Sequence, residues 1–454
     1  MSYELALIGG KLCDGFNIRN GNIYISEEKI KAITPCDVIL EARQSYDCSG
    51  FFVFPGFIDP HVHLNLDLGK YISSDNYETA SDAALSDGVT TFFDFTEPVR
   101  FKEDFEKVLE DKFLQAKKSK VDYGLHFTLG ENQGFNAEEI ASFTIDHGIP
   151  SVKIFTAYGD SKRRTDRGFM YELFRLSSKK GFVVLVHSED DELIRNNMRH
   201  IPAIIDNLSR IRSTESELVA VLDVLLLAQL GKGQVYIVHL SSGKTLEELH
   251  KLKNSWSDNV VIETCPQYLL LDNSRLKGEE NYLFSFCPPL RSEGERNKLL
   301  EFLKKGRVQT IGTDHCPFSI SEKIENAPDL NSIPYGLPTL GFTFSLMRSL
   351  ISDPLLLARL LSVNPAKYLG LFPEKGSLIP GTDADLVVID MDKEWTIGTP
   401  IFGKAEYSPY HGLAVKGKIA MTFLRGELAY NGKEITLASG AGRFIKRNPI
   451  HWGD

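Results

Sequence analysis

Two histidines one residue apart, His61 and His63, are the residues of this chain best suited to binding a metal ion. They follow the apolar run 51–54 and a Pro-Gly break, so we expect them where a short strand leaves the core. Because residues i and i+2 of an extended strand point to the same side, both imidazoles can reach one ion. An isolated His-X-His pair is a weak motif, so the rest of the chain must supply further ligands.

Short apolar runs alternate with helical patterns through the middle of the chain. The expected strands are 54–58, 89–95, 123–128, 151–155, 182–186, 234–238, 260–263 and 308–311. Near-continuous apolar strands separated by helices predict a parallel sheet that is covered on both faces. Eight such units favour a (β/α)8 barrel of the α/β class, with a doubly wound sheet as the alternative.

The two ends of the chain have a different texture, in which short strands alternate with Gly-containing turns. The expected strands are 4–8, 22–26, 30–33 and 45–48 near the start, and 385–390, 418–425 and 427–430 near the end. Asn-Gly and Asp-Gly pairs are typical of β-turns. We therefore expect residues 1–54 and 372–454 to form one small β domain, and residues 55–371 to form the barrel.

Further candidate ligands lie at the ends of the expected barrel strands. Lys153 lies within the fourth strand, His187 and His239 follow the fifth and sixth, and Asp314 follows the eighth. Each has an ordinary explanation alone, such as a hydrogen-bonded core histidine or a helix N-cap. A barrel brings these strand ends together, however, so their joint placement with the His-X-His pair predicts one metal-binding cavity.

Lys153 is the unusual member, because it interrupts an apolar strand. Burial of a lone ammonium is costly and lowers its pKa. A neutral amine can take up carbon dioxide to give a carbamate, which is chemically a carboxylate ligand that could bridge two metals. The alternative is a lysine that extends its ammonium to solvent. Imidazole and carboxylate ligands suit zinc, and manganese or iron would also fit.

Composition limits the other functional classes. The chain has 454 residues and a net charge of −10, which argues against nucleic-acid binding. The N-terminus lacks the pattern of a signal peptide, and the longest apolar stretch, 218–230, is too short to span a bilayer and is expected to be a buried helix. The six cysteines are scattered without CxxC pairs, which argues against disulfides and favours a cytoplasmic location.

Several segments resemble the hydantoinase and dihydropyrimidinase branch of the amidohydrolase superfamily, whose members are cyclic amidohydrolases. The resemblance extends from about residue 4 to residue 447. The segments that carry it are 55–64, 152–158, 236–241, 263–269, 288–291, 312–317, 333–338 and 381–386.

The resemblance implies a barrel with a small β-sandwich-like domain, two zinc ions, and usually a homotetramer, with a homodimer as the other possibility. It implies that Lys153 is carbamylated to N6-carboxylysine and bridges the two metals. The first metal would take His61, His63, Lys153 and Asp314. The second would take Lys153, His187 and His239.

The activity implied is hydrolysis of the cyclic amide bond of dihydropyrimidines or 5-substituted hydantoins to N-carbamoyl amino acids, by a metal-bridging hydroxide. Asp314 would act as general base and then acid, and Tyr158 would bind the substrate and stabilise the oxyanion. Cys287 and Tyr335 occupy substrate-binding positions where the family usually has serine and asparagine. The resemblance implies main-chain contacts there, so these departures leave the preferred substrate open.

Three alternatives remain. Dihydroorotase normally has an arginine shortly after the His-X-His pair, whereas Leu64 and Asn65 follow it here. Allantoinase also opens a hydantoin-type ring. A non-catalytic assembly protein of the same fold, such as the collapsin response mediator proteins, lacks most of the metal ligands, whereas all six positions are filled in this chain.

Overall fold

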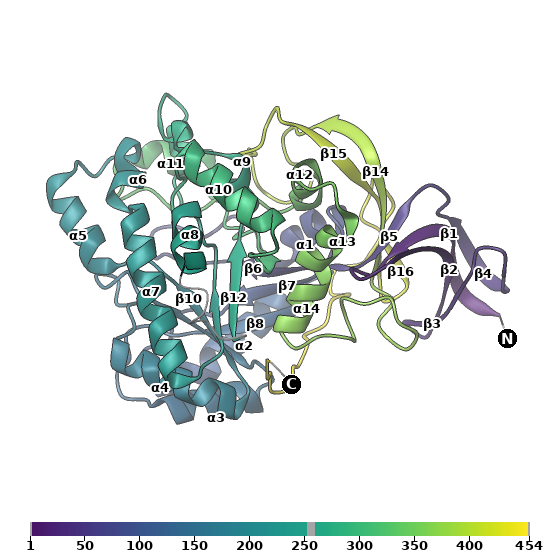
Figure 1. Ribbon diagram of the computed structural model, residues 1–454, viewed down its shortest axis with the longest axis horizontal. Helices are drawn as coiled ribbons and strands as arrows, with labels where there is room; N and C mark the ends of the chain where they lie inside the picture. The colour runs from purple at the N-terminus through teal and green to yellow at the C-terminus, as the bar shows by residue number, and fades with distance from the viewer. Residues whose placement is uncertain (1, 252–258, 453–454) are drawn as a thin grey trace.

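The computed structural model describes residues 2–251 and 259–452. It consists of a parallel barrel enclosed by helices and a mixed sheet built from both ends of the chain, which lies at one end of the long axis (Figure 1). The expected α/β barrel with a small β domain is confirmed.

The barrel strands pair in chain order, each parallel to the next. They are β6 (Phe57–Val62), β7 (Val89–Phe95), β8 (Asp122–Thr128), β9 (Ser151–Phe155), β10 (Val183–His187), β11 (Val235–Ile237), β12 (Val260–Thr264) and β13 (Thr310–Ile311). Most residues of these strands are buried, as expected for a parallel sheet that is covered on both faces.

The first barrel strand begins three residues later than expected. The apolar run before the His-X-His pair forms a separate strand, β5 (Phe52–Pro55), which pairs with β14 (Leu386–Thr396) in the small sheet. Gly56 follows it, and a Cβ there would lie 2.2 Å from Thr90 Oγ1. Two apolar strands separated by this glycine thus belong to two different sheets.

The barrel closes between its first and last strands through main-chain hydrogen bonds made by candidate metal ligands. The Asp314 amide donates to the His61 carbonyl at 2.9 Å, and the His63 amide donates to the His315 carbonyl at 2.8 Å. Closure therefore places the histidine pair directly beside Asp314.

Helices cover the outside of the barrel (Figure 1). They are α1 (Tyr77–Ser86), α2 (Phe105–Ala116), α3 (Ala137–Asp146), α4 (Arg167–Lys180), α5 (Asp191–His200), α6 (Leu208–Ile211), α7 (Thr214–Gly231), α8 (Gly243–Lys251), α9 (Pro266–Leu270), α10 (Glu293–Lys304), α11 (Ile320–Asn326), α12 (Thr343–Leu350), α13 (Pro354–Ala358) and α14 (Asn364–Tyr368).

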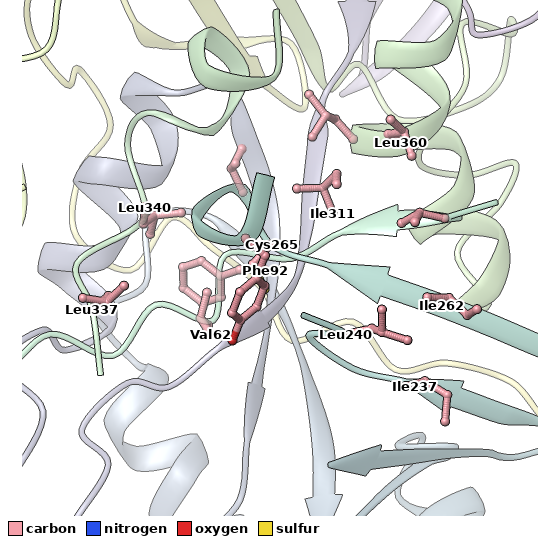
Figure 2. Packing of buried hydrophobic residues seen from close by; sticks show 14 of the residues in the cluster. Val62, Phe92, Ile237, Leu240, Ile262, Cys265, Ile311, Leu337, Leu340 and Leu360 are labelled. Carbon is pink, nitrogen blue, oxygen red and sulfur yellow. The ribbon is translucent and has the colours of Figure 1, made fainter. Parts of the chain in front are cut away.

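Apolar side chains fill the space between barrel and helices. Val62, Ile237, Ile262 and Ile311 come from four barrel strands and belong to one buried cluster with Leu360 (Figure 2). Burying side chains of this size stabilises the fold by about 1.5–3 kcal/mol each. This continuous core fixes the strand ends that bear the candidate ligands.

The apolar stretch 218–230 lies in α7, which is only partly buried. Ala220, Val224 and Ala228 face the core, whereas Leu226 and Leu230 are exposed by 52% and 63%. No helix within residues 2–251 and 259–452 has both the length and the apolar character needed to cross a bilayer.

The small sheet combines strands from both chain ends. Its remaining strands are β1 (Tyr3–Cys13), β2 (Ile18–Ser26), β3 (Lys29–Thr34), β4 (Ala42–Asp47), β15 (Ala414–Leu424) and β16 (Glu427–Tyr430). The last described segment returns to the barrel, where the Arg443 carbonyl and the Ile445 amide bond to Tyr123 and Arg447 donates to the Leu125 carbonyl.

A buried ionic cluster joins the small sheet to the barrel. Lys375 Nζ lies 2.8 Å from Asp122 at the start of β8, 2.5 Å from Asp385, and 3.2 Å from Asp383. Arg425 pairs with the other oxygen of Asp122. The three carboxylates could themselves hold a metal ion, but the Lys375 ammonium already supplies the positive charge among them.

We expect Lys375→Met to lower the free energy of unfolding by about 3–5 kcal/mol, because it leaves buried carboxylates without their main counter-charge. Chemical denaturation measures this. The control is Lys416→Met, since Lys416 pairs with Glu394 at 3.5 Å on the exposed surface and should cost no more than about 1 kcal/mol. Equal losses in the two variants would contradict a joining role for the cluster.

Candidate metal centre

Three candidate ligand atoms form a compact triangle at the closure of the barrel. His61 Nε2 lies 3.2 Å from His63 Nε2 and 3.2 Å from Asp314 Oδ1, and His63 Nε2 lies 3.3 Å from the same oxygen. In a tetrahedral site with roughly 2.0–2.1 Å zinc–ligand bonds, neighbouring ligand atoms are about 3.3 Å apart. The triangle therefore has the dimensions of one face of such a site.

The tautomer of His61 supports this reading. Its Nδ1 lies 2.8 Å from Glu263 Oε1, a fully buried carboxylate. That contact places the proton on Nδ1 and leaves the lone pair of Nε2 facing the other two ligand atoms. Electron pairs that face each other at this distance repel unless a cation or proton lies between them. Burial alone would lower the pKa of His61, but Asp314 and Glu263 raise it to about 9. The position therefore favours positive charge, and its three ligand atoms fit a metal ion.

A second pair of histidines, both buried, lies beside the first. His187 Nδ1 lies 3.0 Å from His239 Nε2, and the ring of His239 is 5.4 Å from that of His61. Glu189 Oε2 lies 2.8 Å from His187 Nε2, so that nitrogen carries the proton and Nδ1 is left as the ligand. The two histidine pairs thus form two adjoining ligand groups.

Lys153 is 2% exposed and lies near Phe95, whose ring also contacts His61 and His63. Its Nζ is 5.4 Å from the ring of Phe95 and 5.3 Å from that of Phe155, and none of the hydrogen bonds among the described residues involves it. Burial lowers the pKa of Lys153 to about 7, although the charges of Asp314 and Glu263 act to raise it. A substantial fraction of the amine is therefore neutral near pH 7.

Three of the candidate residues have a backbone conformation that is rare for side chains other than glycine. The φ angles are +67° for Tyr158, +41° for His239 and +53° for Asp314. Non-glycine residues in this region cost roughly 1–3 kcal/mol each and concentrate at functional sites. The fold maintains this strain at the positions that carry candidate site residues.

Tyr158 lies beside the second histidine pair. Its ring is 4.9 Å from that of His187. Burial raises the pKa of Tyr158 well above its usual range, and the charge of Arg212 acts in the opposite direction. The hydroxyl therefore stays protonated at neutral pH and can donate a hydrogen bond.

The other two predicted substrate residues lie on neighbouring segments. Cys287 is half-buried, and burial raises the pKa of its thiol to about 12, so it is neutral. The Tyr335 hydroxyl donates to the Leu330 carbonyl at 2.7 Å. The two segments are joined directly, because the Gly336 amide donates to the Ser285 carbonyl at 2.9 Å.

Sequence reasoning missed four residues that support this site. Glu263, Glu189 and Arg212 surround the histidines, and Lys323 joins the segments of Cys287 and Tyr335. Lys323 Nζ donates to Ser285 Oγ at 2.7 Å and to the Pro334 carbonyl at 3.1 Å. Two of the four had a usable signal: Glu189 follows His187 with the same i, i+2 spacing as the first histidine pair, and Glu263 ends the expected strand 260–263.

Comparisons with known proteins identify similar sequences. A family model described as "Amidohydrolase family" matches residues 52–429. A D-hydantoinase from Geobacillus stearothermophilus is 31% identical over 457 residues, which covers 96% of this chain and 95% of the relative. A D-phenylhydantoinase from Escherichia coli O127:H6 is 33% identical over 433 residues, which covers 92% of this chain and 90% of the relative.

Solved structures give the same picture. A dihydropyrimidinase from Brevibacillus agri NCHU1002 superimposes with a TM-score of 0.92 at 28% identity, covering 98% of this chain and 99% of its own. The crystal structure of a D-hydantoinase gives a TM-score of 0.92 at 29% identity, with 99% of both chains covered.

We expect Glu263→Gln to weaken metal binding by about 10–100-fold, because the amide cannot replace the carboxylate that orients His61. Dialysis against graded chelator, followed by elemental analysis, measures this. The control is Asp87→Asn, another buried carboxylate, which accepts the Thr343 amide at 2.7 Å and contacts none of the four histidines. Equal metal affinity in the Glu263→Gln variant and the unaltered protein would rule out this role for Glu263.

Proposed function

Since this chain belongs to the amidohydrolase family, we propose that it hydrolyses the cyclic amide bond of 5-substituted hydantoins or dihydropyrimidines to N-carbamoyl amino acids. Relatives named D-hydantoinase and D-phenylhydantoinase over almost the whole chain support this reaction. The observation that carries the proposal is the pair of adjoining ligand groups in the barrel: the ligand atoms of His61, His63 and Asp314 lie 3.2–3.3 Å apart, and those of His187 and His239 lie 3.0 Å apart.

The residues present fit a binuclear site. We assign His61, His63 and Asp314 to one metal and His187 and His239 to the other. Two divalent ions held there would supply Lewis acidity and make water nucleophilic at neutral pH. Zinc suits this set of imidazole and carboxylate ligands, and manganese or iron is also compatible with it.

Lys153 is proposed to complete both ligand groups as a carbamate. Its lowered pKa and its lack of a hydrogen-bonded partner among the described residues support this. Carbon dioxide adds to the neutral amine, a proton leaves the nitrogen, and the product is an anionic ligand with two oxygens. Together with the charge of Asp314, the added negative charge would offset part of the positive charge of two dications, which the neutral His61, His63, His187 and His239 leave uncompensated.

Asp314 is proposed as the proton carrier. Burial alone would raise the pKa of Asp314, but His61 and His63 hold it well below its usual range. The carboxylate is thus available to accept the proton of the attacking water, which it returns to the departing ring nitrogen.

Tyr158 is proposed to donate a hydrogen bond to the oxyanion that develops on the attacked carbonyl. Main-chain groups near Cys287 and Tyr335 would bind the rest of the ring amide. Because these contacts use the main chain, replacing the family's usual serine and asparagine need not abolish binding.

Assembly into a homotetramer or homodimer is also proposed. The exposed face of α7 supports it. Val219, which is 43% exposed, lies about two turns before Leu226, and Leu230 lies about one turn after it, so the three side chains present apolar surface along one side of the helix.

A ring-opening assay on dihydrouracil, substituted hydantoins, allantoin and dihydroorotate tests the proposed function. We expect turnover of hydantoins or dihydrouracil that is lost with chelator and restored by zinc or manganese. Asp314→Asn should lower kcat by roughly 10²-fold or more, because it removes the proton carrier. Asp111→Asn on the exposed face of α2 is the control. Activity confined to dihydroorotate or allantoin, or none with any metal, would refute the proposal.

A further inference from the structure

A buried arginine lies against the second histidine pair. Arg212, at the end of α6, is 8% exposed. Its Nε lies 3.2 and 3.0 Å from the two oxygens of Glu189, and its Nη2 lies 2.5 Å from Glu189 Oε2. Two adjacent guanidinium nitrogens thus contact the carboxylate, and both lie closest to Oε2. Such charge-assisted hydrogen bonds are stronger than neutral ones.

Through Glu189 this pair reaches a candidate metal ligand. Glu189 Oε2 accepts from His187 Nε2 at 2.8 Å, and Arg212 Nη2 lies 3.5 Å from the same nitrogen. Glu189 thus lies between Arg212 and His187, where its carboxylate can fix the orientation and tautomer of the His187 ring.

The same guanidinium also contacts the proposed oxyanion donor. Arg212 Cζ lies 4.7 Å from the centroid of the Tyr158 ring. A guanidinium at this distance attracts the electron-rich face of the ring, and the attraction is larger in buried surroundings. Arg212 thus packs against Tyr158 while it pairs with the carboxylate behind His187.

Other groups fix Arg212 in turn. Arg291 Nη1 donates to the Arg212 carbonyl, and Arg291 Nε donates to Ser241 Oγ at 2.9 Å. On the other side, the Glu189 amide donates to Thr156 Oγ1 at 3.0 Å. The arrangement is more than an ion pair that neutralises charge, because it connects Tyr158, His187 and the segment after His239.

We propose that Arg212 is a positioning residue for ring opening: it sets His187 through Glu189 and holds the Tyr158 hydroxyl in place through its contact with the ring. This inference rests on the proposed function. One side chain, Arg212, would then link the orientation of His187, a proposed ligand of the second metal, to stabilisation of the oxyanion by Tyr158.

A double-mutant cycle with Tyr158→Phe tests the link to the tyrosine. Arg212→Met should lower kcat at least about tenfold with a smaller change in KM, since a lost oxyanion donor costs about 10²–10³ in kcat. In the Tyr158→Phe background the same change should lose most of its effect on kcat. Arg212→Lys keeps the charge but cannot contact Glu189 through two nitrogens. Its kcat should therefore lie between that of Arg212→Met and that of the unaltered protein.

Metal titration tests the link to His187 without using activity. Arg212→Met and Glu189→Gln should each weaken binding of one of the two metal equivalents by about 10–100-fold and leave the other nearly unchanged. The control is Arg296→Met, since Arg296 pairs with Asp272 at 3.0 Å away from the histidines. Circular dichroism checks folding, and if Arg212→Met does not fold, Arg212→Lys and Glu189→Gln carry both tests.

Two results would overturn the inference. One is that Arg212→Met lowers kcat by the same factor with and without Tyr158→Phe. The other is that Arg212→Met and Glu189→Gln leave the affinity for both metal equivalents unchanged. Failure of the proposed function is distinguishable, because the unaltered protein would then open none of the cyclic amides. The metal titration would still test the link from Arg212 to His187.

Discussion

The main-chain hydrogen bonds that close the barrel are the interaction on which the rest of the site depends. The Asp314 amide bonds to the His61 carbonyl, and the His63 amide bonds to the His315 carbonyl. These residues are about 250 positions apart in the sequence, and only closure of the sheet brings their side chains together. Parallel strands in register then carry Lys153, His187 and His239 to the same end, because parallel strands share one direction.

Closure concentrates polar groups in a region that is otherwise apolar, and the structure offsets the cost with buried partners. Glu263 accepts from His61, from the His239 amide and from the Tyr236 hydroxyl. Each of these contacts satisfies a group that would be costly to bury alone. The surrounding carboxylates also decide which ring nitrogen of each histidine is free, so the partners determine which atoms can bind a metal.

Much of the fold could be predicted from the sequence, because buried parallel strands have a simple pattern. Strand β7 coincides with the predicted run, and the observed strands at β8 and β9 begin within a residue of theirs. The predicted start of the first barrel strand was three residues too early, because β5 and β6 are both apolar. Nothing local indicates that these two strands belong to different sheets. The pairing of β5 with β14 joins residues more than 300 positions apart.

The candidate ligands were also accessible from the sequence, because each lies in or directly after an apolar strand. Two of the supporting residues were not. Arg212 lies between two helices, and Lys323 lies on the short helix α11, so no periodic pattern marks either one. Their roles come from contacts between distant segments, such as that of Lys323 with Ser285 and Pro334, which a single sequence does not encode locally.

The binuclear centre can be tested most directly by a crystal structure of the metal-loaded protein with anomalous scattering data. We expect two metal peaks, one against His61, His63 and Asp314 and the other against His187 and His239. Electron density should extend from Lys153 Nζ as a carbamate that contacts both peaks. A single metal peak beside an unmodified lysine would contradict the binuclear, carbamate-bridged centre.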